Sequence, residues 1–109
     1  MSSDLERAFE THWKQLGGPE LTPEYQFHPT RRYKLDFAIP GLLVGIEIEG
    51  GIWLDGGGRH NRAEGFIKDC RKYNLLAALG WTIFRLPEPL ISDPDHLEMI
   101  IKFIETKPV

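Results

Sequence analysis

The sequence predicts an α/β fold, in which helices flank a central mixed β-sheet and an additional helix follows at the C-terminus. Segments with helical and strand-like apolar patterns follow one another in the order helix, three strands, helix, strand, helix. The helix between the third and fourth strands is typical of a crossover connection, and the short Pro40-Gly41 turn between the second and third strands is typical of an antiparallel hairpin. A sheet that contains both connections is mixed.

The first helix begins at Ser3 or Asp4, either of which can cap its N-terminus. It ends at the Gly-Gly-Pro sequence of residues 17–19, because glycine and proline stop helices. Between these points, apolar residues recur at helical spacing and define one face that can pack against a core. This face consists of Leu5, Phe9, Trp13 and Leu16.

Three strands follow the first helix. An apolar stretch at residues 25–27 predicts the first strand, and a turn that contains Pro29 leads into the second strand at residues 33–39. The third strand extends over residues 42–49 and ends at a pair of glycines. The hairpin turn places the second and third strands side by side in the sheet.

The second half of the chain adds two helices and one strand. Residues 62–79 predict a helix that ends at Gly80, and residues 81–86 predict the last strand, which two prolines break. A final helix begins at Pro94, where Asp93 can cap it. The first of these helices is expected to face the core with Phe66, Cys70, Tyr73 and Ala77, and the final helix with Leu97, Ile100, Ile101 and Ile104.

Three carboxylates lie on the apolar, strand-like sequence in the middle of the chain, namely Asp36, Glu47 and Glu49. Glu47 and Glu49 are two residues apart, so they share one face of the third strand. Asp36 can reach the same face from the second strand if the other face of that strand is the apolar one. That apolar face would consist of Leu35, Phe37 and Ile39.

Charged groups at this position need a compensating partner, because burying an unpaired charge costs free energy. A hard divalent metal such as Mg²⁺ or Mn²⁺ would supply it, since oxygen ligands suit these ions and a bound ion keeps carboxylates ionised. Alternating isoleucine and glutamate is also the ordinary pattern of an edge strand with one solvated face. The spacing by itself leaves both interpretations open.

Length and composition indicate one globular domain that spans residues 1–109, with 41% hydrophobic and 27% charged residues. No apolar run approaches the roughly 20 residues of a membrane span, and the N-terminus has no apolar signal core. The single cysteine, Cys70, excludes an internal disulfide and fits a reducing compartment. We therefore expect a cytoplasmic protein without a membrane partner.

The charge distribution is more informative than the net charge of −3. Residues 28–72 carry eight lysines and arginines against six aspartates and glutamates, three of which are the candidate metal ligands. The segments before and after this region are both net acidic. Basic residues around an acidic centre are expected where a metal site and a phosphate backbone meet.

The αβββαβ order, with an aspartate on the second strand and Glu-x-Glu on the third, resembles the PD-(D/E)XK nuclease superfamily, which has a restriction-endonuclease-like core. The resemblance covers roughly residues 5–86 of the chain. Within the superfamily, the sequence is similar to archaeal-type and phage Holliday junction resolvases. The blocks that carry this similarity are Phe27-His28-Pro29-Thr30-Arg31-Arg32-Tyr33, Glu47-Ile48-Glu49-Gly50-Gly51-Ile52-Trp53, Gly58-Arg59-His60 and Asp69-Cys70-Arg71-Lys72-Tyr73-Asn74.

The resemblance implies a site for Mg²⁺, for which Mn²⁺ would substitute. Asp36, Glu47 and Glu49 would be ligands, together with a glutamate on the first helix. Glu6 fits this position by its distance in sequence from the end of the helix, and Glu10, one turn further on, is the alternative. All three strand carboxylates and Glu6 are thus candidate catalytic and metal-binding residues.

Glu49 departs from the superfamily pattern, which usually has a lysine at this position. That lysine helps to activate the attacking water and stabilises the charge of the transition state. In some relatives the following helix supplies the basic group, so Lys72 or Lys68 could take this role here. Lys72 is preferred because it lies beside Tyr73 of the expected core stripe, although a solvated lysine on a helix is the alternative.

The activity implied by the resemblance is metal-dependent hydrolysis of DNA that leaves a 5′-phosphate and a 3′-hydroxyl. A homodimer would place two such sites on opposing strands of a four-way junction and act as a Holliday junction resolvase, in a bacterial or phage-infected cell. The alternatives are a duplex nicking, restriction-like or mismatch-repair-type endonuclease, and a DNA-binding module without catalytic activity.

Basic residues on both sides of the carboxylates in the sequence are expected to contact the phosphate backbone rather than the bases. One group lies just before Asp36, and the other follows the triple glycine of residues 56–58, which predicts a flexible loop. Trp53, beside that loop, can either stack on an unpaired base or close the core. The candidate DNA contacts are Arg31, Arg32, Lys34, Arg59, His60 and Arg62.

Overall fold

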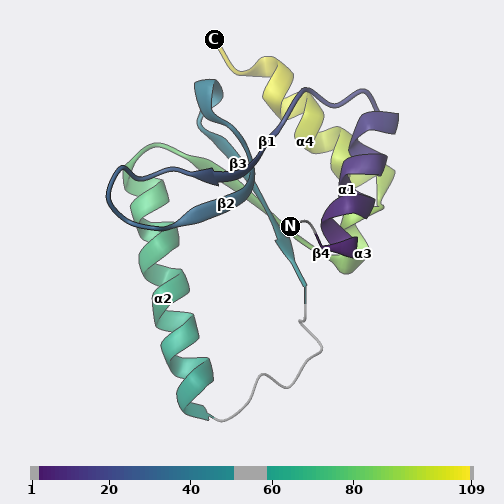
Figure 1. Cartoon of the computed structure of the whole chain (residues 1–109). Coiled ribbons are helices and arrows are strands. Elements are labelled where there is room, and N and C mark those ends of the chain that lie inside the picture. Colours follow the sequence, from purple (N-terminus) through teal and green to yellow (C-terminus); the bar gives the residue numbers. More distant parts are fainter. Residues whose placement is uncertain (1–2, 51–58, 109) are drawn as a thin grey trace.

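The computed structural model describes residues 3–50 and 59–108, and the side chains of 3–50 and 62–108. A four-stranded sheet forms the central layer, with α1, α3 and α4 on one face and α2 on the other (Figure 1). The elements are α1 (Asp4–Gln15), β1 (Thr22–Gln26), β2 (Lys34–Ile39), the short 3₁₀ helix η1 (Pro40–Leu42), β3 (Val44–Glu49), α2 (Arg59–Ala78), β4 (Thr82–Pro87), α3 (Glu88–Ile91) and α4 (Pro94–Thr106).

The sheet is mixed, as the sequence predicted. Its strands lie in the order β1-β2-β3-β4. β2 is antiparallel to both β1 and β3, and β3 is parallel to β4. The parallel register places Glu47 of β3 opposite Arg85 of β4. The predicted α/β class, the hairpin and the crossover are therefore confirmed, together with the C-terminal helix.

Two N-caps set where the helices α1 and α4 begin. Ser3 caps α1 by accepting a hydrogen bond from the backbone N–H of Glu6, whose side chain accepts one from the N–H of Ser3 in return. Asp93 caps α4 by accepting a hydrogen bond from the N–H of His96. The C-terminal end of α1 leads into Gly17, whose φ of +75° is a backbone conformation that favours glycine.

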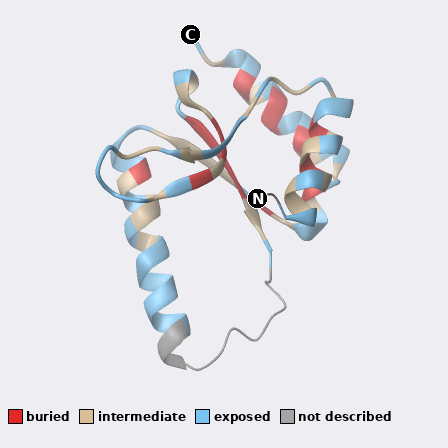
Figure 2. Ribbon diagram, viewed as in Figure 1, coloured by how far each residue is buried: buried red, intermediate tan, exposed pale blue. Residues whose placement is uncertain are grey.

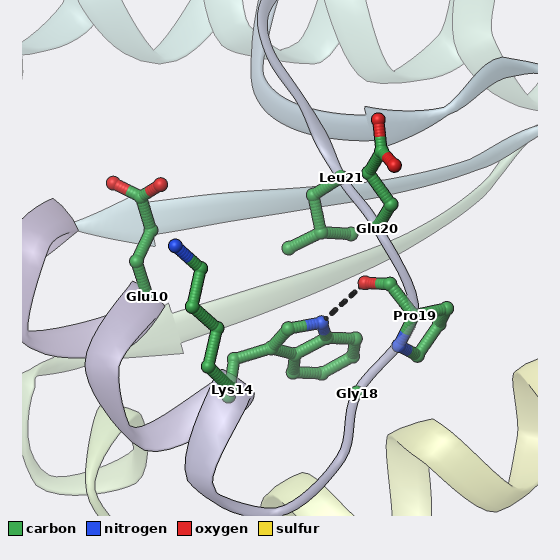
Figure 3. Close-up of a pocket in the computed structure, with 7 residues that line it drawn as sticks. Glu10, Lys14, Gly18, Pro19, Glu20 and Leu21 are labelled. Atoms are coloured by element: carbon green, nitrogen blue, oxygen red, sulfur yellow. Dashed lines mark hydrogen bonds between the residues drawn. The ribbon is translucent and has the colours of Figure 1, made fainter.

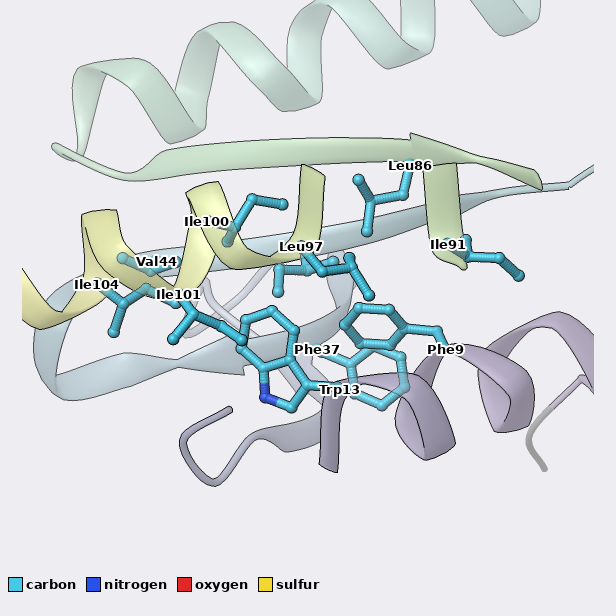
Figure 4. Packing of buried hydrophobic residues seen from close by; sticks show 11 residues of the cluster. Phe9, Trp13, Phe37, Val44, Leu86, Ile91, Leu97, Ile100, Ile101 and Ile104 are labelled. Atoms are coloured by element: carbon cyan, nitrogen blue, oxygen red, sulfur yellow. The ribbon is translucent and has the colours of Figure 1, made fainter. Parts of the chain in front are cut away.

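The larger part of the hydrophobic core lies between the sheet and the pair α1 and α4 (Figure 4). Phe9 of α1 packs with its ring centroid 5.1 Å from that of Phe37 on β2 and 5.4 Å from that of Trp13. The apolar faces predicted for both helices are the faces that pack here. The buried members are Phe9, Trp13, Phe37, Val44, Ile46, Leu86, Ile91, Leu97, Ile100, Ile101 and Ile104.

The core-facing stripe predicted for α2 is confirmed in part, because Tyr73 packs against the buried cluster on this face of the sheet. Phe66 is 69% exposed and Ala77 is also exposed, whereas Leu76, outside the predicted stripe, is fully buried. The N-terminal half of α2 extends beyond the sheet, and its described side chains, at residues 62–69, are exposed (Figures 1 and 2). Only the C-terminal half covers the sheet, in a smaller cluster around Leu35, Ala38 and Leu76.

The remaining differences concern local geometry. The first strand begins earlier than predicted, at Thr22, and η1 takes the place of a tight two-residue turn. The segment after β4 forms the helical turn α3, which the sequence did not predict. Pro89 is compatible with it because Pro89 lies in the first turn, where proline is tolerated. Among the described residues, no helix has both the length and the apolar character needed to cross a membrane.

Leu97→Ala should destabilise the protein by about 2 to 5 kcal/mol, because it removes a fully buried side chain between α4 and the sheet. Met99→Ala, two residues along the same helix, is the control, since Met99 is 46% exposed and its loss should cost less than about 1 kcal/mol. Urea denaturation followed by circular dichroism measures both values. Equal effects of the two substitutions would contradict the described packing of α4.

Candidate active site

The hydrogen-bond ladder between β2 and β3 ends just before Asp36. The last register pair is Phe37 with Ile46, and beyond it two carboxylates accept backbone hydrogen bonds. The N–H of Asp36 donates to Oε2 of Glu47 at 3.3 Å, and the N–H of Ile48 donates to Oδ2 of Asp36 at 2.7 Å. Each carboxylate therefore satisfies a backbone donor of the neighbouring strand where the ladder has ended.

The alternation of β2 side chains between the two faces of the sheet is broken at Asp36. Leu35 packs with Leu76 in the α2 cluster, whereas Phe37 packs with Phe9 on the opposite side of the sheet. The prediction that Leu35 and Phe37 share a face is therefore wrong. The register pairs of β1 with β2 skip Asp36 and also Glu24, whose φ is +49°. The irregular backbone explains why the ladder yields to side-chain hydrogen bonds here.

Glu47 is a buried carboxylate, only 6% exposed. Its Oε1 accepts hydrogen bonds from the Lys72 ammonium and, at 3.2 Å, from the Tyr73 hydroxyl, both on α2. A buried carboxylate needs such a charged partner, because its desolvation would otherwise favour unfolding. Burial also raises the pKa of the Tyr73 hydroxyl, with the Glu47 charge adding to the effect, so Tyr73 stays a donor.

The Asp36 carboxyl is partly buried next to the carboxylate of Glu47. Burial is the largest cause that raises the pKa of this carboxyl, to about 7. The hydrogen bond from the Ile48 N–H lowers the pKa, whereas the hydrogen bond with Glu47 and the negative charges of Glu47 and Glu6 raise it further. A divalent cation beside Asp36 would reverse this balance by favouring the ionised carboxylate. The carboxylate oxygens of Asp36 and Glu47 are the type of donor that a hard ion such as Mg²⁺ or Mn²⁺ prefers.

Of the two candidate ligands on α1, Glu6 is the one whose charge acts on Asp36. Glu10 instead lines a separate hollow of about 380 Å³ between α1 and the chain that follows it (Figure 3). There the Trp13 indole N–H donates to the Pro19 carbonyl at 2.8 Å, and the indole packs against Gly18, where any side chain would collide with it. This hollow includes neither Asp36 nor Glu47.

Glu49 is engaged outside the pair formed by Asp36 and Glu47. It accepts a hydrogen bond of 2.5 Å from Nε of Arg85 on β4, and the Arg85 guanidinium lies 4.6 Å from the centre of the Tyr73 ring. The hydrogen bond to Glu49 raises the pKa of Arg85 above its ordinary value. Within the described ranges, no three carboxylate, imidazole or thiol groups form a cluster that could hold a metal. The predicted four-carboxylate ligand set is therefore not assembled as one group.

The predicted DNA-contacting residues divide into two groups. Arg31, Arg32 and Lys34 are exposed around the β1–β2 connection, in the sequence just before Asp36. Arg62 is exposed in the first turns of α2. The side chains of Arg59 and His60, the triple glycine and Trp53 lie outside the described residues, so their predicted roles stay predictions.

Sequence reasoning missed two residues of the site. Tyr73 packs against the core as the pattern predicts, but its hydroxyl also donates a hydrogen bond to Glu47. Arg85, for which the pattern predicts no role, neutralises Glu49. A signal was present for Arg85, since it is a charged residue between two apolar ones on the last strand. For Tyr73 the signal was its position next to Lys72.

A comparison with solved structures finds similarity to the catalytic domain of the homing endonuclease I-Bth0305I, with a TM-score of 0.64 over 96% of this chain and 97% of that domain. The chain shares the fold of this domain. The sequence identity is 22%, a level at which the similarity establishes the fold and nothing further about the site. No family model and no curated protein sequence matches the chain.

Asp36→Asn should stabilise the metal-free protein more at pH 8 than at pH 5. Because the pKa of Asp36 is raised from 3.8 to about 7 in the folded protein, the unfolded chain loses this proton first, so the free energy of unfolding falls as the pH rises from about 4 to about 7. Asparagine removes this penalty and can still accept the hydrogen bond from Ile48. The gain at pH 8 should be roughly 1 to 2 kcal/mol after allowance for solvent screening.

Urea denaturation in the presence of EDTA at both pH values measures the difference. Asp95→Asn, at an exposed position in the first turn of α4, is the control and should show no change between pH 5 and pH 8. If Asp36→Asn had the same effect on the free energy of unfolding at both pH values, Asp36 would not have a raised pKa.

Proposed function

We propose that this protein is a metal-dependent endodeoxyribonuclease that hydrolyses phosphodiester bonds in DNA. The observation that carries the proposal is the meeting of Asp36, Glu47 and Lys72 where the β2–β3 ladder ends. Two carboxylates and one lysine are the groups that metal-assisted phosphodiester hydrolysis uses. The shared fold with a nuclease catalytic domain supports the proposal, as does the resemblance to the PD-(D/E)XK superfamily.

Asp36 and Glu47 would hold Mg²⁺ or Mn²⁺, with Glu6 as the third candidate ligand and Glu49 as a ligand only if it leaves Arg85. When bound, the ion supplies Lewis-acid chemistry, which acidifies water and offsets the charge of the phosphate. The backbone hydrogen bonds of Asp36 and Ile48 fix the orientation of both carboxylates before any ligand arrives. This preorganisation is what a metal site requires of its supporting residues.

Lys72 would act on the phosphate. Its ammonium already lies against the buried Glu47, so a phosphodiester that reaches the carboxylates also meets a positive charge. The ammonium would stabilise the additional negative charge of the transition state. In the superfamily this role usually belongs to a lysine at the position that Glu49 occupies here. Tyr73 would position Glu47 through its hydroxyl, and Arg85 would keep Glu49 neutralised.

The preferred substrate within this proposal is a four-way DNA junction, cut symmetrically by a homodimer. This finer proposal is supported by the resemblance to Holliday junction resolvases in four sequence blocks. The second candidate is cleavage of ordinary duplex DNA, which is favoured by the fold shared with a homing endonuclease catalytic domain. The two differ in whether paired incisions depend on a branch point.

A substrate panel tests the proposal directly. The protein is incubated with Mg²⁺ and end-labelled four-way junction, linear duplex and flap DNA, and the products are resolved on denaturing gels. Paired symmetric nicks in the junction alone are expected; cleavage of duplex at a similar rate would instead favour the second candidate. Absence of cleavage with both Mg²⁺ and Mn²⁺ would refute the nuclease and leave a DNA-binding module.

In the same assay, Asp36→Asn and Glu47→Gln should lower the cleavage rate by at least about a hundredfold, since each removes a charged ligand. Binding of junction DNA should be retained or tightened, because a negative charge is lost near the phosphates. Glu98→Gln, at an exposed position of α4, is the control and should cut normally. Normal cutting by either site variant would exclude this metal site.

Lys72→Ala should slow cleavage about a hundredfold at saturating DNA, while the matched control Lys68→Ala, one turn earlier on an exposed position of α2, should not. Lys72→Arg retains the charge beside Glu47 and should restore part of the rate. A thermal melt of each variant separates catalysis from folding. Wild-type turnover of a folded Lys72→Ala variant would remove Lys72 from the mechanism.

A further inference from the structure

A second hollow, of about 310 Å³, lies between the β1–β2 connection and the flank of α2. Arg31 and Tyr33 line it from the connection, and Arg71, Asn74 and Leu75 line it from the helix. No acidic residue contributes to the lining. Two guanidinium groups, an amide and a phenol form a surface rich in hydrogen-bond donors, which suits an anion.

The loop side of the hollow is held in one conformation by its own hydrogen bonds. Nδ1 of His28 accepts from the backbone N–H of Thr30 at 3.2 Å and of Arg31 at 3.0 Å. The Gln26 side-chain amide donates to the carbonyls of His28 and Arg31, both at 3.1 Å. These contacts fix the backbone of Arg31 in place, so its side chain starts from a defined point beside α2.

The helix side presents a face distinct from the catalytic one. Arg71, Asn74 and Leu75 are separated by three and four residues and therefore share one face of α2. Lys72, one position after Arg71, points instead to Glu47. Neighbouring residues of one turn of α2 therefore contribute to the hollow and to the carboxylate site.

Both arginines are available for a ligand. Arg31 and Arg71 are exposed, and within the described part of the chain neither guanidinium forms an ion pair with a carboxylate. Arginine binds phosphate oxygens through two parallel hydrogen bonds, which makes it the common choice for phosphate recognition. Asn74 adds an uncharged donor from the helix.

We propose that this hollow binds a phosphate of the DNA backbone, close to the phosphodiester at the carboxylates, through Arg31 and Arg71. The proposal rests on the proposed function, because it assigns the position of the same DNA strand. It adds Arg71, Asn74 and Tyr33 to the DNA-contacting surface. The contact is to the backbone, so it contributes affinity and register without sequence preference.

Fluorescence anisotropy with a labelled duplex and a labelled four-way junction tests the proposal, with EDTA present to prevent cleavage and with the salt concentration varied. Arg31→Ala and Arg71→Ala should each weaken binding about tenfold at a fixed salt concentration, for all DNA sequences alike. Each should lower the slope of log affinity against log salt by about one. Arg71→Lys, which retains charge but loses the paired hydrogen bonds, should bind with intermediate affinity.

Lys102→Ala is the control, since Lys102 is exposed on α4, which covers the opposite face of the sheet, and its loss should leave affinity and slope unchanged. Wild-type affinity and slope in both arginine variants would overturn the proposal. Millimolar inorganic phosphate could also raise the melting temperature of the wild-type protein but not that of Arg71→Ala. If the DNA affinity of Arg71→Ala were unchanged at the same time, the hollow would bind a small phosphate compound, and the proposal of a DNA phosphate site would be overturned.

The outcome is separable from that of the proposed function. DNA binding that depends on Arg31 and Arg71 in a protein that never cuts would support the hollow and refute the nuclease. Cleavage by the wild-type protein, together with normal DNA affinity and salt slope in both Arg31→Ala and Arg71→Ala, would refute the hollow and leave the nuclease proposal standing. The two proposals therefore fail in different experiments.

Discussion

The ion pair between Lys72 and Glu47 is the contact on which the candidate site depends. Glu47 is almost completely buried on a central strand, and among the described residues the ammonium of Lys72, the hydroxyl of Tyr73 and the N–H of Asp36 offset the loss of its hydration. The contacts of Lys72 and Tyr73 with Glu47 therefore link α2 to β3 of the sheet. They also fix the carboxylate oxygens at the point where β2 and β3 separate.

The two faces of the sheet therefore serve different purposes. The face covered by α1 and α4 is apolar and supplies most of the buried surface that stabilises the fold. The face covered by α2 carries a smaller apolar cluster and, beside it, the charged groups of the site. The apolar core on one face stabilises the fold enough to offset the free-energy cost of burying the Glu47 carboxylate on the other face.

The helix α2 contributes residues both to the carboxylate site and to the hollow lined by Arg31 and Arg71. One of its faces presents Lys72 and Tyr73 to Glu47, and the adjacent face presents Arg71 and Asn74 to the basic hollow. A positively charged surface next to buried carboxylates is the arrangement expected where a phosphate backbone is held against a metal site. The excess of basic residues in the central part of the chain has a structural counterpart in this helix and in the β1–β2 connection.

The sequence by itself determined the order of the elements, the helix caps and the apolar faces of α1 and α4, because these depend on local periodicity and on single capping residues. It also singled out Asp36, Glu47 and Lys72. Only the tertiary structure decided that Glu49 pairs with Arg85 and that Phe66 is exposed. Those outcomes depend on which strand lies beside β3 and on how far α2 extends beyond the sheet, and neither is encoded in the spacing of residues along one element.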